Sequence, residues 1–380
     1  MKQLPYCDFH LHSDRSDGCL PLQELLTQAR QYGIGCLCVT DHNAALPEET
    51  LREVRRRFPD MTVFQGCEFS ANHSVGSRRN LEVHVIGLDF RLTAEMERFL
   101  AGNRLSETLQ RQYVNRMIEN LRRSGLPFAG DFDSLQAAYP QNHIGRAVVA
   151  REVLRQGLLP GGTVADVFDR YIGDHPGPKL AYTPKPAVYH SLADCVRAIL
   201  DAGGIPILAH PLSYGLELPE VRQLMQDFAD AGGLAAEAFY GRWSAEEQSI
   251  ARKMAGKCCP PLRCSAASDF HGWDSGTLDY RFPAAEILPP LLEARRAAGR
   301  APEAAVGERT EAMMAALENR DAAAAQAAAR TLCDEACAAA DRAAWDPGIS
   351  GEERARIRRE AEYACLLAGD EEMARRYRTI

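Results

Sequence analysis

The sequence predicts an α/β fold in which strands alternate with helices around a parallel sheet, either open or closed into a barrel. The first observation is a repeated order of short apolar runs and amphipathic segments, typical of βαβ units. The second is a content of 46% apolar and 25% charged residues, as in folded globular proteins. The third is that histidines and acidic residues directly follow the apolar runs. The length of 380 residues suits two or three domains.

The alternation begins near the N-terminus. Leu22, Leu25, Leu26 and Ala29 recur at helical spacing after Pro21, a residue that suits the start of a helix. Short apolar runs lie before and after this helix and predict strands. These strands are expected at residues 6–9, 36–39, 61–64 and 81–88.

Residues 92–178 interrupt the alternation. This segment reads as helical, with helices from about residue 95 to residue 123 and an irregular Pro- and Gly-rich stretch at 173–178. The alternation then returns. It predicts helices at 192–202, 218–231 and 244–257 and strands at 205–209, 234–239 and 263–267.

From about residue 286 the composition shifts to Ala, Glu and Arg, which predicts helix. We therefore expect three parts. Residues 1–91 and 179–285 form the barrel, residues 92–178 form a helical insertion, and residues 286–380 form an Ala-rich helical extension. The extension is either a plain appendage or a surface for a protein partner.

Histidine and carboxylate side chains gather at the predicted strand ends. His10 and His12 lie two apart on a strand, so both imidazoles point to the same face. Because the carboxyl ends of barrel strands converge at one mouth, we expect a common site there. Imidazole and carboxylate ligands together favour Zn²⁺, Mn²⁺ or Fe²⁺ over Ca²⁺. The further candidates on or after these strands are Asp14, Asp17, Asp41, His42, Glu68, His84, His210, Asp269 and His271.

Composition excludes several other classes of protein. The net charge of −8 argues against broad capture of long nucleic acid, and no apolar run approaches the length of a membrane span. The N-terminus lacks the apolar core of a signal peptide, so we expect a cytoplasmic protein. The twelve cysteines include no CxxC pair, which makes a zinc ribbon unexpected and favours reduced, mostly buried thiols.

The segments DFHLHSDRSDG, VTDHN, GCEFS, EVHVIGL, LAHP and SDFHG occur in this order and resemble the polymerase and histidinol phosphatase (PHP) family. The resemblance covers residues 6–90 and about 180–285. It implies a distorted seven-stranded β/α barrel with two or three metals at its mouth. The arrangement of HSxxSDG and TDH most resembles the PHP phosphoesterases that act on nucleotides and short RNA.

The resemblance also implies a set of metal ligands. Asp17 is a harder ligand than histidine, so its metal position is expected to bind weakly or to favour Mn²⁺. Asp41 is expected behind the ligands, orienting an imidazole through its other nitrogen. The first metal would be held by His10, His12, Glu68 and Asp269, the second by Glu68, His84 and His210, and the third by Asp17, His42 and His271.

The activity implied is hydrolysis of a phosphate ester of a nucleotide or a short 5′-phosphorylated oligonucleotide. Two metals about 3.5–4 Å apart clamp a phosphate and lower the pKa of a bound water, so that a hydroxide attacks phosphorus. We expect His210 and Asp269 to be catalytic. His210 is a candidate for protonating the leaving oxygen only if its ring is not fully committed to a metal. The helical insertion would act as a lid.

Four residues are candidates for contact with the substrate. Arg146 ends an NHIGR segment that resembles the family segment supplying a phosphate-binding arginine, and its planar guanidinium suits two phosphate oxygens. Alternatively, Arg146 only caps the helix that follows it. His143 lies three residues earlier. Glu237 and Tyr240 are expected at the mouth, although an aromatic ring at a strand end more often packs in the core.

Three other functions stay open at this point. One is histidinol-phosphate phosphatase activity, which the same family contains. Another is C–N bond hydrolysis on a related barrel, although that chemistry usually shows a metal-bridging lysine and no lysine here falls in a strand-end motif. The third is an interaction module that keeps the metal site for stability and works through its helical extension.

Overall fold

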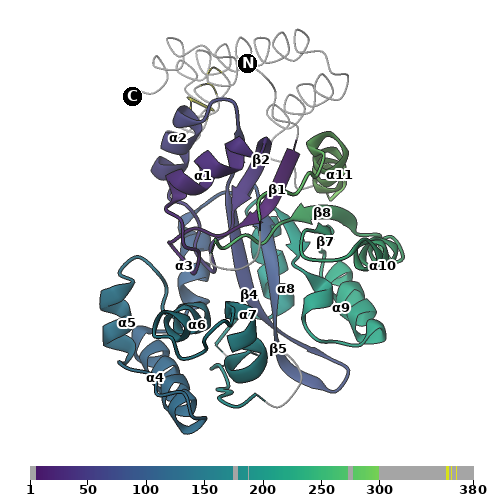
Figure 1. Ribbon diagram of the computed structural model, residues 1–380. Coiled ribbons are helices and arrows are strands. Elements are labelled where there is room, and N and C mark those ends of the chain that lie inside the picture. Colours follow the sequence, from purple (N-terminus) through teal and green to yellow (C-terminus); the bar gives the residue numbers. More distant parts are fainter. Residues whose placement is uncertain are drawn as a thin grey trace.

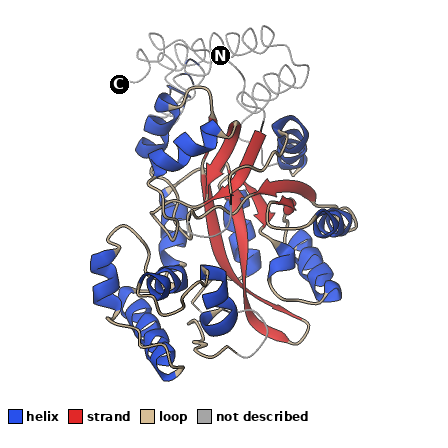
Figure 2. Ribbon diagram, viewed as in Figure 1, coloured by secondary structure: helices blue, strands red, loops and turns tan. Residues whose placement is uncertain are grey.

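The computed structural model describes residues 6–173, 179–186, 188–272 and 277–298, together with residues 357, 358, 361 and 365. In these residues eight strands form two sheets that adjoin each other (Figures 1 and 2). The first sheet contains β1 (Tyr6–Leu11), β2 (Ile34–Val39) and β3 (Thr62–Phe64). The second contains β4 (Gly66–Val75), β5 (Arg78–Leu88), β6 (Ile205–Leu208), β7 (Ala235–Tyr240) and β8 (Arg263–Ala267).

Strand pairing is only partly parallel. The first sheet is parallel throughout, as are β6–β7 and β7–β8, whereas β4–β5 and β5–β6 are antiparallel. The two sheets meet at two isolated bridges, Leu11 with Phe270 and His42 with Glu68. The predicted α/β class is therefore confirmed. The closed seven-stranded barrel is not, because the described strands form open sheets of three and five.

The strand β4 was not predicted as a separate element. Glu68 was expected to follow the third strand, but it lies within β4, opposite Ile86 of β5. Gly66 marks the start of β4 at a point where it lies very close to the end of β2. A Cβ there would lie 2.7 Å from both the Cβ of Cys38 and the carbonyl oxygen of Val39, which only glycine avoids.

Helices cover the outer faces of both sheets (Figure 1). The helices α1 (Leu22–Gln31) and α2 (Glu48–Arg57) bury Leu25, Leu26 and Leu51 against the first sheet. The second sheet is covered by α3 (Ala94–Gly102), α8 (Leu192–Asp201), α9 (Leu218–Asp230) and α10 (Ala245–Ala255). A short 3₁₀ turn, η2 (Pro211–Ser213), follows β6.

The segment between β5 and α8 has an apolar core of its own. Met117, Val148 and Val167 belong to this core, which contains no residue of either sheet among those described. Its helices are α4 (Glu107–Arg123), α5 (Phe132–Ala138), α6 (Arg146–Arg155), α7 (Val164–Val167) and the π-helical turn η1 (Phe168–Ile172). In contrast, α3 packs with the second sheet, although its residues were grouped with the insertion.

The helix α11 (Ala284–Ala297) closes the end of the sheets opposite the helical insertion (Figure 1). Its residues Ile287 and Leu291 pack in one cluster with Cys7 of β1 and Ala266 of β8. The expected boundary at residue 286 therefore falls inside a helix that packs in one core with strands of both sheets. Most of the predicted extension lies outside the described residues. Among the described residues, no helix combines the length and the apolar character needed to span a membrane.

We predict that Leu291→Ala lowers the free energy of unfolding by about 2–5 kcal/mol, because the side chain is fully buried between α11 and the sheets. Urea denaturation followed by circular dichroism measures this loss. Glu293→Ala on the same helix is the control, since that side chain is 62% exposed. Equal stability of the two variants would show that α11 is not part of the core that it shares with the sheets.

Candidate metal centre

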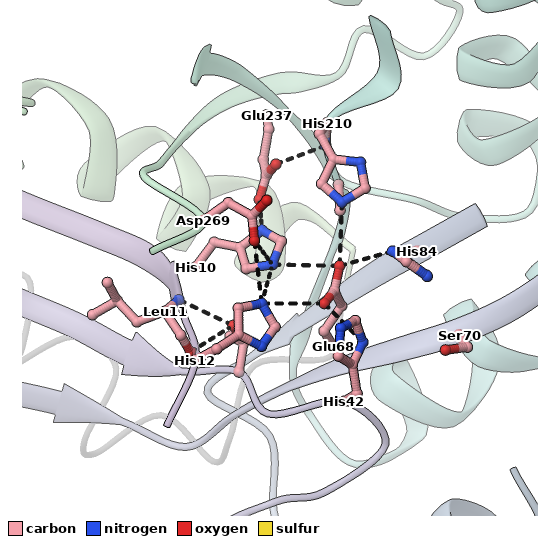
Figure 3. Close-up of polar contacts among 12 residues, drawn as sticks. His10, Leu11, His12, His42, Glu68, Ser70, His84, His210, Glu237 and Asp269 are labelled. Carbon is pink, nitrogen blue, oxygen red and sulfur yellow. Dashed lines mark hydrogen bonds and ion pairs between the residues drawn. The ribbon is translucent and has the colours of Figure 1, made fainter. Parts of the chain in front are cut away.

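The carboxylate of Glu68 lies at the centre of a group of imidazoles (Figure 3). This side chain is almost completely buried, and it lies near the start of β4. Both of its oxygens meet ring nitrogens contributed by different strands and loops. Oε1 lies 3.0 Å from His84 Nδ1 and 3.3 Å from His10 Nε2 and from His210 Nε2, and Oε2 lies 3.0 Å from His42 Nδ1 and 3.4 Å from His12 Nε2.

Two further carboxylates flank this group. Asp269 Oδ1 lies 3.3 Å from His10 Nε2 and 3.2 Å from His12 Nε2. Asp17 Oδ1 lies 3.4 Å from His271 Nε2, and its Oδ2 lies 3.6 Å from the ring of His42. All nine predicted ligands are thus brought together.

The donor atoms fall into four sets that could each hold one cation. Compared with the sets implied by resemblance, His84 groups with His42, and His210 groups with His10. Asp14 belongs to none of the sets found in the described residues. The sets are His10, His12 and Asp269; His10, Glu68 and His210; His42, Glu68 and His84; and His12, Asp17, His42 and His271.

The geometry of these donors fits a divalent metal. His10 Nε2 and His12 Nε2 are 3.0 Å apart. Two facing ring nitrogens form a hydrogen bond only when one of them carries a proton, whereas two unprotonated nitrogens at this separation suit a shared metal. Glu68 Oε2 and His84 Nδ1 are buried and make no hydrogen bond with any residue that the structure describes. A metal–nitrogen bond of about 2.0–2.1 Å places neighbouring ligand atoms about 3.0–3.4 Å apart, which matches the contacts around Glu68.

The carboxylates of this cluster stay ionised despite their burial. Burial by itself raises the pKa of Glu68, but the imidazoles of His42 and His10 hold that pKa well below its ordinary value. Asp17 and Asp269 respond in the same way, with burial opposed by neighbouring imidazoles. Buried negative charge of this kind needs positive charge beside it, which protonated imidazoles or a divalent cation bound in their place supply.

Two ligand candidates have left-handed backbone conformations that non-glycine residues rarely adopt. The φ angle is +27° at His210 and +53° at Asp269. Each is held by a hydrogen bond with a side chain of β7. The backbone N–H of His210 donates to Glu237 Oε2 at 2.6 Å, and the hydroxyl of Tyr240 donates to Asp269 Oδ2 at 2.7 Å. Strained backbone of this kind collects at functional sites.

Three predicted roles differ from the contacts observed. Asp41 accepts hydrogen bonds from Ser13 and Ser16 instead of orienting an imidazole, so it fixes the loop after β1. Glu237 is buried behind His10 and does not face the mouth. Tyr240 is 4% exposed, and its hydroxyl binds a ligand candidate, which leaves no face on which a base could stack.

The side chain of Arg146 lies at the N-terminus of α6, next to the cluster. Its Nε donates to the hydroxyl of Tyr113 at 2.6 Å, and its Nη2 lies 4.0 Å from Glu82 Oε2. Glu82 Oε1 lies 2.7 Å from Lys185 Nζ and 3.3 Å from His84 Nε2. One carboxylate therefore joins two cationic side chains to a ligand candidate.

His143 lies where the insertion meets the loop after β1. Its backbone N–H donates to the carbonyl oxygen of Ser16 at 2.9 Å, and Gln110 Nε2 lies 3.1 Å from the ring. The side chain of His143 is exposed at this junction.

Sequence reasoning missed Glu82 and Lys185. Glu82 lies two residues before His84 on β5 and so shares its face, a spacing that could have identified it. Lys185 lies in an irregular segment with no motif, and only the folded chain brings it to Glu82.

Comparison with known proteins agrees with this geometry. The model of the PHP domain family matches residues 8–147. A 5′-3′ exoribonuclease from Haemophilus influenzae is 30% identical over 273 residues, which covers 70% of this chain and 91% of that protein. A 3′,5′-nucleoside bisphosphate phosphatase from Chromobacterium violaceum is 28% identical over 289 residues, covering 75% and 93%. The solved structure of an amidohydrolase from Chromobacterium violaceum, with bound sulfate and no metal, matches with a TM-score of 0.59 and 26% identity, over 76% of this chain and 96% of that one.

The fold, the imidazole–carboxylate cluster and these similarities define a metal-dependent phosphoester hydrolase. The chain belongs to the PHP domain family, as its motifs indicated. The roles of individual ligands stay predictions.

We predict that Glu68→Gln lowers metal affinity more than about tenfold, because it removes the charge that five imidazoles share. Elemental analysis after dialysis against Mn²⁺ or Zn²⁺ measures the loss. His73→Ala is the matched control, since that imidazole lies outside the cluster and contacts Asp227 at 2.8 Å. Wild-type metal content in Glu68→Gln would contradict the assignment.

Proposed function

We propose that this protein hydrolyses a phosphate ester of a nucleotide or of a short 5′-phosphorylated oligonucleotide. The observation that carries the proposal is the cationic group beside the metal cluster. Arg146 and Lys185 are joined through Glu82 to His84, so a phosphate bound by these cations would lie beside the metal cluster. Guanidinium and ammonium groups donate charge-assisted hydrogen bonds to phosphate oxygens, which favours an anionic ligand.

The relatives support the same substrate class. One is named as a 5′-3′ exoribonuclease and another as a 3′,5′-nucleoside bisphosphate phosphatase. Both names describe phosphorylated nucleotides or pieces of nucleic acid. The net charge of −8 favours a small or short substrate over long nucleic acid, because the protein as a whole repels an extended phosphate backbone.

The proposed chemistry divides the work between the metals and the side chains. Divalent metals held by the cluster would polarise the phosphoryl group and lower the pKa of a bound water. Arg146 binds non-bridging phosphate oxygens through its planar guanidinium. We assign His210 to protonating the leaving oxygen and Asp269 to the reacting centre, where its Oδ1 lies between His10 and His12.

The helical insertion is proposed as the lid that limits substrate length. Two bonds support this role, since both join the insertion to the loop after β1 at the edge of the cluster. The N–H of His143 donates to the carbonyl oxygen of Ser16, and Asn142 Nδ2 donates to that of Gly18 at 2.9 Å. The metals are proposed to be Mn²⁺, Zn²⁺ or Fe²⁺, in two or three positions.

The substrate class is tested with the Mn²⁺-loaded protein on a panel of phosphate esters. We predict phosphate release from p-nitrophenyl phosphate and from a nucleoside bisphosphate or a 5′-phosphorylated dinucleotide, and loss of activity with excess EDTA. Histidinol phosphate and an N-acyl amino acid are included as substrates of the competing functions. Turnover of histidinol phosphate alone, or of the N-acyl amino acid alone, would contradict the proposal. Loading the protein with Zn²⁺ or Fe²⁺ in place of Mn²⁺ completes the test, and no turnover with any of these three metals would also contradict it.

The cationic group is tested separately by kinetics. Arg146→Ala and Lys185→Ala are each predicted to raise KM about tenfold or more, because each removes a charge-assisted contact of about 1.5–3 kcal/mol with the substrate phosphate. Arg155→Ala on the same helix pairs only with Glu152 among the contacts described and is the control. Unchanged KM in both variants would remove the cationic group from substrate binding.

A further inference from the structure

We propose that Glu237 is a positioning residue that fixes the protonated nitrogen of His10 and the backbone at His210. Glu237 lies on β7 and is 1% exposed. Its Oε1 lies 2.8 Å from His10 Nδ1, and its Oε2 accepts the backbone N–H of His210 at 2.6 Å. One buried carboxylate therefore contacts two ligand candidates that belong to different strands (Figure 3).

The contact with His10 determines which ring nitrogen faces the cluster. A carboxylate only accepts hydrogen bonds, so the 2.8 Å contact requires a proton on His10 Nδ1. Nε2 of the neutral ring then carries a lone pair. This nitrogen points at Glu68, Asp269 and His12, at distances of 3.0–3.3 Å. Glu237 thus holds His10 in the tautomer that a metal ligand needs.

The contact with His210 has a separate effect. His210 has a φ of +27°, a conformation that costs free energy in a residue with a Cβ. The 2.6 Å bond from its N–H to a charged oxygen stabilises this conformation at the point where β6 ends. The ring of His210 is thereby directed at Glu68, with Nε2 at 3.3 Å from Oε1. Glu237 couples the placement of two imidazoles that share one carboxylate.

Glu237→Gln separates this role from a general structural one. Glutamine keeps the shape, and its single oxygen can still accept from the N–H of His210. Its amide group then faces His10 Nδ1 and can only donate, which requires the proton on Nε2 instead. Ser265→Ala is the matched control. Ser265 is buried and pairs with Glu237 across β7–β8, but its Oγ has no hydrogen-bond partner among the described residues.

The experiment uses the full-length protein labelled with ¹⁵N at histidine. Long-range ¹H–¹⁵N spectra of the metal-free protein, with the His10 signals assigned by their loss in His10→Ala, should show His10 protonated at Nδ1. Glu237→Gln should move the proton to Nε2 and weaken Zn²⁺ and Mn²⁺ binding about 10- to 100-fold in a competition titration. Ser265→Ala should match wild type in both measurements.

Absence of a proton from Nδ1 of His10 in wild type would overturn the proposal, and this measurement decides the matter even if Glu237→Gln does not fold. Unchanged metal affinity in a folded Glu237→Gln protein would also overturn it. Neither readout involves turnover of any substrate, so the outcome is independent of the proposed substrate class.

Discussion

The central constraint in this structure is the burial of the Glu68 carboxylate among five imidazoles. A buried anion of this kind is unfavourable unless positive charge lies beside it. The surrounding histidines come from β1 and the residue that follows it, from β5 and from the loops after β2 and β6, so the sheets must hold these segments in register for the charge to be balanced. The ring of donors that results is a site for divalent metals, and the phosphoesterase chemistry of the family depends on it.

The supporting contacts explain why the ligand candidates keep their places. Asp41 fixes the loop after β1 through Ser13 and Ser16, while Glu237 and Tyr240 bind His210 and Asp269 from β7. These supporting side chains are buried, and each one makes a hydrogen bond with a ligand candidate or with the loop after β1. Precise placement of metal ligands depends on such a surrounding shell.

The sequence was sufficient for the α/β class and for the ligand candidates, because motifs such as HxH and SDFH are local. It was not sufficient for sheet topology. The strand β4 reads as a continuation of β3, which conceals its antiparallel hairpin with β5. The pairing of β5 with β6 joins segments that lie far apart in the sequence. Lys185 and the buried positions of Glu237 and Tyr240 could not be predicted for the same reason, since tertiary packing decides which way a strand-end side chain faces.

Metal positions measured directly would test the central claim most sharply. Crystals of the protein soaked in Mn²⁺ or Zn²⁺ would be measured on both sides of the metal absorption edge, so that anomalous difference peaks locate the ions. The account predicts at least two peaks, with a carboxylate oxygen of Glu68 coordinating at least one of them. No peaks, or peaks only at sites away from Glu68, would contradict it.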